Sequence, residues 1–247
     1  MRGLQKSTLL MLAAALIAAC SFTTANIKKA VMAREINEDK SPAMEVTSFH
    51  GYESMLHCCV EMANVPSGTK VKAIWRSNEG AVVIDSTEIE LESDSWIDFS
   101  LTLSEQALPY GAYTVDLFIN GKKDRSVPFT VVPQFEEGII KEAVTSKAIS
   151  ESYFPQQPTA VFPTNTAVVY APIYVQDAPQ GSKFSAYWYQ HDTSGGRAPI
   201  TSADIEFADS GWIGFSMTLN NGLPAGKYSV DILLDGAVEQ TLEFSAK

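Results

Sequence analysis

The chain has 247 residues, 45% of them hydrophobic, so it can bury the core of one or two domains. Its 18 basic and 29 acidic residues give a formal net charge of -11. This excess of carboxylates argues against nucleic-acid binding and against electrostatic adhesion to anionic lipid, because both need a basic surface. Three cysteines are too few for a disulfide scaffold.

Residues 1–19 are typical of a signal peptide. Arg2 and Lys6 precede the apolar run Leu9 to Ala19, which is about half the ~20 residues needed to span a bilayer. The run ends in Ile17-Ala18-Ala19-Cys20, which resembles the lipobox of bacterial lipoproteins. The resemblance implies cleavage before Cys20 and acylation of that cysteine.

The residue after the cysteine bears on which membrane holds the anchor. Ser21 stands where an aspartate would indicate retention at the inner membrane, so the resemblance points to the outer membrane of the bacterial envelope. The alternative is an ordinary signal peptide cut near Ala19 or Ala25, with Cys20 incidental. Whether the protein would face the periplasm or the cell surface stays open.

Residues 20–44 are predicted to be a lipidated N-terminus and tether. They carry mixed charge and few large apolar residues, with Ser41-Pro42 near the end. A helical turn or two within Ile27 to Ile36 would be compatible with this tether.

An internal repeat then occupies most of the chain. Ser86 to Leu103 aligns without gaps on Ser202 to Leu219, with nine of 18 positions identical. Two further blocks recur in the same order, at 65–70 and 178–183 and at 108–113 and 223–228. These matches indicate a duplication, with one copy in residues 45–132 and the other in 158–247.

Within each copy the apolar residues recur at every second position, which is typical of half-buried antiparallel strands. The predicted inward residues of the first copy are Leu56, Cys58, Val60, Met62, Val71, Ala73, Trp75, Ile97, Phe99, Leu101, Leu103, Tyr113, Val115, Leu117 and Ile119. Asn120-Gly121 and Asp235-Gly236 predict tight hairpins, since both central residues of such turns need positive φ. About seven strands fit in each copy, as in a small sandwich.

Two details make the copies resemble immunoglobulin-like and fibronectin-like sandwiches. Trp75 and Trp188 fall on the third strand, where such domains commonly bury a tryptophan. The pattern Leu-Pro-x-Gly-x-Tyr, ending at Tyr113 and Tyr228, resembles a tyrosine corner and implies that each hydroxyl bonds to upstream backbone. No cysteine on the sixth strand faces Cys58, unlike in antibody domains. The predicted fold is all-β, with two tandem immunoglobulin-like sandwiches.

Residues 133–157 are predicted to link the copies. Apolar residues between Phe135 and Ser150 are spaced as on a short amphipathic helix. Pro155, Pro158 and Pro163 then predict an extended chain that enters the second copy. A plain spacer is favoured over a helix that docks a partner.

The inventory of reactive residues disfavours an enzyme. His50, His57 and His191 are the only histidines and lack helical metal-ligand spacing. No nucleophile elbow, phosphate loop or dinucleotide fingerprint is present. We therefore expect no catalytic residues, no metal and no cofactor.

The dipeptide Cys58-Cys59 is the one unusual local feature. Parity places Cys58 inside, and Cys59 outside beside His57 and Glu61. Alternate residues of a strand lie ~6.6 Å apart, so at most two neighbours could share one metal ion. The second copy has Tyr170, Pro172 and Tyr174 at these positions. A structural role is favoured, and a metal or redox role for Cys59 is the alternative.

Four aromatic residues form the candidate binding surface. Trp96 and Trp212 have the parity opposite to inward isoleucines, while Tyr187 and Tyr189 flank inward Trp188. Such rings bind proteins or sugars because they offer large contact area at low entropy cost. Alternatively, each tryptophan packs under a loop or against the neighbouring domain.

The sequence therefore predicts a non-enzymatic, lipid-anchored envelope protein. We expect its duplicated domains to bind or scaffold another envelope or extracellular protein. The alternative is a glycan-binding envelope protein that uses the exposed aromatic residues.

Overall fold

The structure, a computed structural model, describes residues 24–78 and 82–247. Within these ranges the chain is all-β and forms several sheets, without a helix. Accordingly, no helix among the described residues is long and apolar enough to cross a membrane. The predicted signal peptide, the lipobox-like motif and Cys20 lie outside the described residues.

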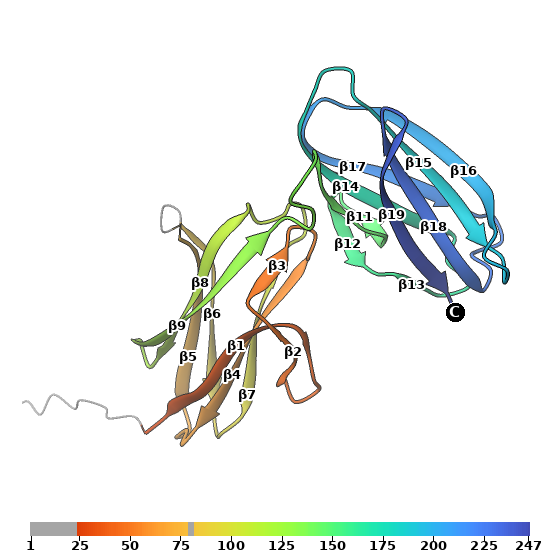
Figure 1. The fold of residues 1–247 in the computed structure, drawn as a ribbon. Helices are drawn as coiled ribbons and strands as arrows, with labels where there is room; N and C mark the ends of the chain where they lie inside the picture. The colour runs from red at the N-terminus through yellow and green to blue at the C-terminus, as the bar shows by residue number, and fades with distance from the viewer. Residues whose placement is uncertain (1–23, 79–81) are drawn as a thin grey trace, which may run out of the picture.

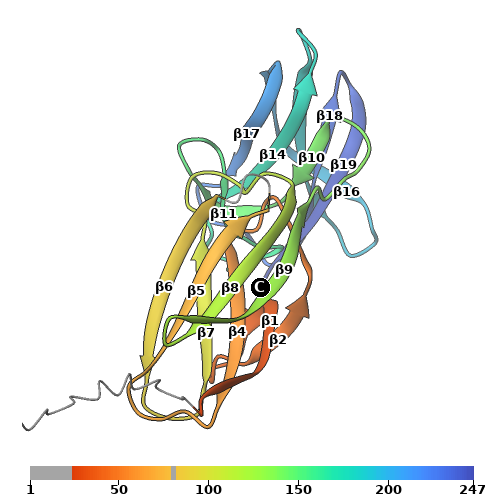
Figure 2. The same cartoon turned by 90° about the vertical axis from the view of Figure 1, so that its left-hand side faces the viewer.

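The N-terminal half contains two sheets (Figure 2). The first runs in the order β2 (Pro42–Val46), β1 (Asn26–Ile36), β4 (Met55–Ala63), β7 (Trp96–Thr102). The second runs in the order β3 (Ser48–His50), β9 (Lys122–Val132), β8 (Gly111–Ile119), β5 (Thr69–Ser77), β6 (Val83–Leu91). Strand β3 pairs with β9 in parallel, and the other pairings are antiparallel.

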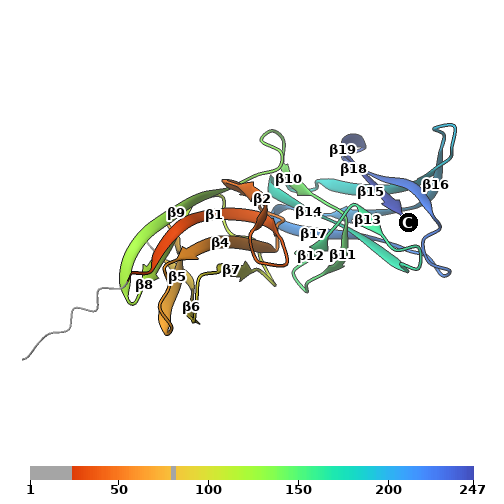
Figure 3. The same cartoon turned by 90° about the horizontal axis from the view of Figure 1, so that it is seen from below.

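The C-terminal half follows it along the molecule and repeats much of this order (Figures 1 and 3). One sheet runs β10 (Ile140–Ala143), β14 (Val168–Ala178), β11 (Ser146–Ile149), β12 (Pro155–Pro158), with β17 (Asp209–Thr218) also paired to β14. The other runs β13 (Val161–Phe162), β19 (Ala237–Ala246), β18 (Gly226–Leu234), β15 (Lys183–His191), β16 (Arg197–Glu206). Strand β13 again pairs in parallel with the last strand.

Each half encloses its own hydrophobic cluster between its two sheets. The predicted inward residues of the first copy lie in the first cluster, and one of them, Leu103, is partly buried at its margin. Trp75 and Trp188 are 0% and 1% exposed, and their rings meet Phe129 and Phe244 edge-on at 5.7 and 5.9 Å. The period-two pattern therefore correctly predicted which side of these strands is buried.

The two predicted hairpin turns adopt the backbone that they require. Asn120 and Gly121 have φ of 49° and 80°, and Asp235 and Gly236 have φ of 50° and 88°. Each pair joins the last two strands of its half, β8 to β9 and β18 to β19. Positive φ at both central residues matches the right-handed twist of the flanking strands.

The tether predicted over residues 20–44 is wrong where the structure describes it. Residues 26–36 form β1, whose residues 26–33 pair with β4 and whose end pairs with β2. Ile27, Ala30 and Met32 face the core, because a register shift between Ile27 and Lys29 changes the inward parity. This irregularity breaks the strict alternation and hid the strand from sequence reasoning.

The helix predicted within the linker 133–157 is also wrong. The segment forms β10, β11 and β12, which join the sheet of β14. A helix this short is marginal without tertiary packing. Here β14 offers unpaired backbone groups, so the linker gains hydrogen bonds as short strands instead. The linker is thus part of the sheet framework and holds the junction between the halves.

Candidate functional site

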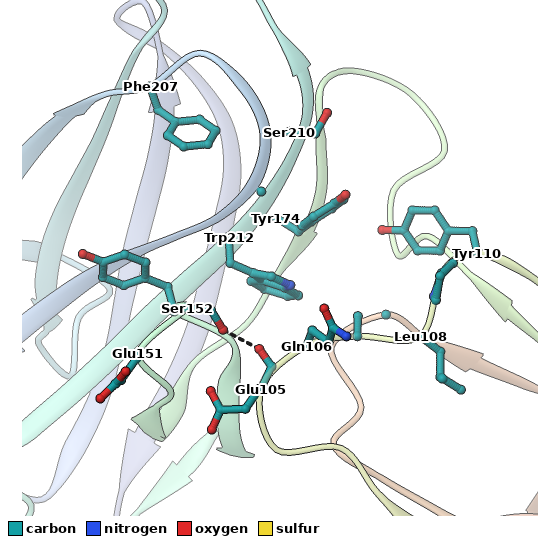
Figure 4. A pocket seen from close by; sticks show the side chains of 15 residues that line it. Glu105, Gln106, Leu108, Tyr110, Glu151, Ser152, Tyr174, Phe207, Ser210 and Trp212 are labelled. Atoms are coloured by element: carbon teal, nitrogen blue, oxygen red, sulfur yellow. Dashed lines mark hydrogen bonds between the residues drawn. The ribbon is translucent and has the colours of Figure 1, made fainter. Parts of the chain in front are cut away.

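A groove of about 930 Å³ lies where the two halves meet (Figure 4). Its first wall is the loop 105–110 of the N-terminal half, and the linker segment 151–153 borders it. Its opposite wall comes from β14 and β17 of the C-terminal half. The aromatic lining residues are Tyr110, Tyr153, Tyr174, Phe207 and Trp212.

Trp212 lies in this groove and is partly covered by the linker. Its neighbour Ile213 points into the core, so Trp212 faces outward as predicted. Its ring contacts Phe154 at 5.6 Å and Tyr174 at 5.5 Å, measured between ring centroids. Phe154 is fully buried. Trp212 therefore both packs against the linker and presents the rest of its ring to the groove.

The tyrosine corners hold the loops that precede β8 and β18. The Tyr113 hydroxyl donates to the Pro109 carbonyl at 2.5 Å, and the Tyr228 hydroxyl donates to the Pro224 carbonyl at 2.7 Å. The bonds implied by the sequence resemblance are thus present in both halves. In the N-terminal half this bond fixes the loop that carries Tyr110 into the groove.

Tyr110 bridges the two halves at the base of the groove. Its ring meets Tyr174 edge-on at 6.3 Å, and its hydroxyl donates to Oε1 of Glu142 at 3.0 Å. Glu142 belongs to β10, so this one side chain contacts two strands of the C-terminal sheet. Burial, together with the carboxylate of Glu142, raises the pKa of Tyr110, so its hydroxyl stays a donor.

Glu142 is a fully buried carboxylate at this junction. Its Oε1 accepts from the backbone amide of Gly51 at 3.0 Å as well as from Tyr110, whereas its Oε2 has no hydrogen-bond partner among the described residues. Burial raises the pKa of Glu142 to about 7, and the hydrogen bonds from Gly51, Tyr110 and Gln134 oppose that rise. The group therefore titrates near neutral pH.

Hydrogen bonds at the rim tie the linker to the N-terminal half. The Ser152 hydroxyl donates to the Glu105 carbonyl (Figure 4), and the Gln156 amide donates to the Ser104 carbonyl. The side chains of Glu105 and Glu151 are exposed there, and neither has an ion-pair or hydrogen-bond partner within the described residues.

Of the four predicted surface aromatics, only Trp212 lines the groove. Trp96 is half-exposed at the start of β7, opposite Glu61 of β4. Tyr187 is 40% exposed on β15. Tyr189, on the same strand, has one ring face covered by the Arg197 guanidinium at 4.0 Å from the centroid. The structure therefore does not gather these four residues into one surface.

Both cysteines of the pair Cys58-Cys59 are buried. Cys58 packs in the core, and Cys59, although on the other face of β4, is 0% exposed. Burial, reinforced by the nearby carboxylate of Asp98, raises the pKa of Cys59 to about 12. His57 bonds to Asp98 at 2.8 Å. No group of three ligand-type residues that could hold a metal occurs in the described part of the chain.

Sequence reasoning missed most of the groove. Tyr174 stood in the sequence as the counterpart of Glu61, and Tyr110 stood inside the corner motif, but neither pattern indicates contact across a junction. The signal for Glu142 was weaker still, because an acidic residue in an acidic chain is unremarkable. The linker forms short strands in place of the expected helix, and this difference brings Glu142 and Tyr153 to the junction.

No protein-family model matches the chain, and no curated protein matches it. Among solved structures, it is similar to a biofilm-associated protein (BSP domain) at 14% identity and a TM-score of 0.28, over 81% of this chain and 28% of that one.

Two further solved structures are similar to a comparable degree. CBD12 from CALX1.2 is 12% identical with a TM-score of 0.29, over 77% of this chain and 79% of that one. Trypsin-activated alpha-2-macroglobulin from Escherichia coli is 11% identical with a TM-score of 0.30, over 89% of this chain and 16% of that one. The chain thus spans only a minor part of two of these proteins. TM-scores this low carry no functional argument.

Proposed function

We propose that this chain is a non-enzymatic protein of the bacterial envelope, anchored by acylated Cys20, that binds a partner protein in the groove between its two halves. The observation that carries the proposal is the composition of that groove. Its aromatic walls come from both halves and are held by buried contacts. Rigid aromatic side chains at the centre of a concave surface supply most of the energy in many protein interfaces.

We propose further that each half is an immunoglobulin-like sandwich and that the two arose by duplication. The sheet β3-β9-β8-β5-β6 has the same order as β13-β19-β18-β15-β16. The buried tryptophan and the tyrosine corner occupy equivalent strands in both halves. Sandwiches of this kind often act as binding modules, with function placed in loops and junctions instead of the core.

Glycan binding through the Tyr187 and Tyr189 face is less well supported. Sugars stack on open ring faces, and Arg197 already covers one face of Tyr189. The same guanidinium is held at 2.7 Å by Asp231, so it would not move away at low cost.

The anchor is tested by metabolic labelling with a fatty-acid analogue, followed by membrane fractionation. The wild-type protein should carry label and sediment with the outer membrane, and Cys20→Ala should lose both properties. Several acyl chains are expected to be needed, because a single chain gives only marginal attachment. A Cys20→Ala protein that remains labelled and membrane-bound contradicts the anchor.

The binding groove is tested with a photoreactive phenylalanine analogue in the native envelope. Placed at Tyr153, which is 47% exposed in the groove, the probe should crosslink to a discrete partner protein. Placed at Tyr187, which is 40% exposed on β15, it serves as the matched control. Crosslinks confined to the Tyr187 position would contradict the groove and favour the outer face of the sheet.

A further inference from the structure

We infer that the groove receives a basic segment of the partner protein, with a Lys or Arg side chain placed among the aromatic rings. This inference rests on the proposed function and names the chemistry of the partner at the same site. Three observations support it: the charge of the lining, the arrangement of the rings, and a similar contact elsewhere in this chain.

The charged side chains that line the groove are all acidic among the described residues. Its described lining residues include Glu105 and Glu151 and no lysine, arginine or histidine. The hydrogen bond from Ser152 to the Glu105 carbonyl brings the segments of both carboxylates together. Figure 4 shows their side chains on the same side of the groove. A concave site lined by one sign of charge concentrates ions of the opposite sign.

Within the described residues, some acidic groups of this protein are neutralised by a basic side chain, and these two carboxylates are not. Glu53, Asp116 and Asp231, for example, each have an arginine partner within 3.2 Å. Glu105 and Glu151 have none within the described residues, so a cationic ligand would meet charges that no internal cation neutralises. An anionic ligand would be repelled.

The rings supply the second part of the recognition. Tyr174 and Trp212 lie in the middle of the groove beside the acidic rim, and Tyr110 lies across from it (Figure 4). A guanidinium or ammonium group over such rings is attracted by about 0.5–2 kcal/mol. The chain contains one such contact already, because Arg197 lies over Tyr189 at 4.0 Å and is held by a carboxylate. The groove has the rings and the carboxylates but no cation of its own.

The test is an array of random ten-residue peptides probed with the full acylated chain in detergent. The bound peptides should be enriched in Lys and Arg beside apolar residues, and raising the salt from 50 to 300 mM should weaken binding several-fold. Neutral oligosaccharides, probed in parallel, should not bind. Enrichment of acidic or uncharged peptides, or binding of the oligosaccharides alone, would overturn the inference.

Variants separate this inference from the proposed function. Glu105→Gln with Glu151→Gln should weaken the basic peptides roughly three- to ten-fold, as expected for two exposed charge pairs. Glu137→Gln with Glu239→Gln, two exposed carboxylates outside the groove, should leave binding unchanged. If the Tyr153 probe crosslinks a partner but the Glu105/Glu151 variant binds normally, the groove is the site and its occupant is not basic. If the Tyr153 probe crosslinks no partner, the proposed function itself fails.

Discussion

The Tyr110 hydroxyl donates a 3.0 Å hydrogen bond to the buried carboxylate of Glu142 and so joins the N-terminal half to a strand of the C-terminal sheet. Tyr110 also contacts Tyr174, so one side chain connects the buried carboxyl of Glu142 to a ring that lines the groove. The contact between the two halves thus includes a carboxyl group whose pKa burial raises to about 7.

Glu142 should make the stability of the protein depend on pH. Its folded pKa of about 7 lies above the ordinary value of 4.5, so the folded state holds the proton more tightly. Its contribution to the free energy of unfolding is present below about pH 4.5 and is lost as the pH rises through 7. The loss is of the order of a few kcal/mol, since each pKa unit corresponds to about 1.4 kcal/mol.

Denaturant unfolding of the wild type and Glu142→Gln from pH 4.5 to 8 measures this effect. The difference in unfolding free energy between the two proteins should shift in favour of Glu142→Gln as the pH rises. Glu137→Gln, at an exposed linker position, is the control and should follow the wild type. Parallel pH profiles for the wild type and Glu142→Gln would show that the junction carboxyl does not titrate in this range.

The tyrosine corners should each contribute measurably to stability. Tyr113→Phe and Tyr228→Phe remove hydroxyls that bond to the Pro109 and Pro224 carbonyls and leave those carbonyls without that donor. Each change should lower the free energy of unfolding by about 1 kcal/mol. Equilibrium denaturation measures it, with Tyr187→Phe as an exposed control that should change little. A loss no larger than in the control would mean that water replaces the corner bond.

The strands within each half could be predicted from the sequence because their environment alternates in a simple way. Leu56, Val60 and Phe99 face one core throughout, so parity alone indicates their burial. Asn120-Gly121 and the corner tyrosines were predicted correctly because a turn and a corner motif also depend on residues close in sequence. These features depend on neighbours within a few residues or on a single sheet face.

The first strand and the junction could not be predicted, and the reasons are physical. The register shift after Ile27 breaks the alternation that would reveal β1. The linker is ambiguous because the hydrogen-bonding edge of β14 decides between strand and helix, and that edge lies about 30 residues away in sequence. The groove forms only when Tyr110 reaches Tyr174 and the linker places Phe154 against Trp212, so no local pattern encodes it.

Trp212 should stabilise the C-terminal half as well as line the groove. Trp212→Ala removes ring contacts with Phe154 and Tyr174. We expect a loss of roughly 2–3 kcal/mol, below the 3–5 kcal/mol typical of a fully buried aromatic residue. Trp96→Ala, at the equivalent position in the N-terminal half, should cost less because no aromatic ring of the linker covers it. Thermal unfolding compares the two, and equal losses would contradict a packing role specific to the junction.

Cys59 should be unreactive in the folded protein. Its thiol is fully buried and its pKa is raised to about 12, so little thiolate is present at neutral pH. Maleimide labelling followed by mass spectrometry should show modification of Cys58 and Cys59 only after addition of denaturant. Rapid labelling of the native protein, abolished by Cys59→Ser, would instead support the metal or redox alternative.

The most direct test of the account fills the groove and measures partner capture from the native envelope. Gln106→Trp places a bulky ring in the groove from an exposed position, and Gln180→Trp adds the same ring at an exposed turn outside it. With both variants folded and membrane-bound, Gln106→Trp should reduce the captured partner at least ten-fold, while Gln180→Trp should retain it. Equal capture by the two variants would show that the partner binds elsewhere.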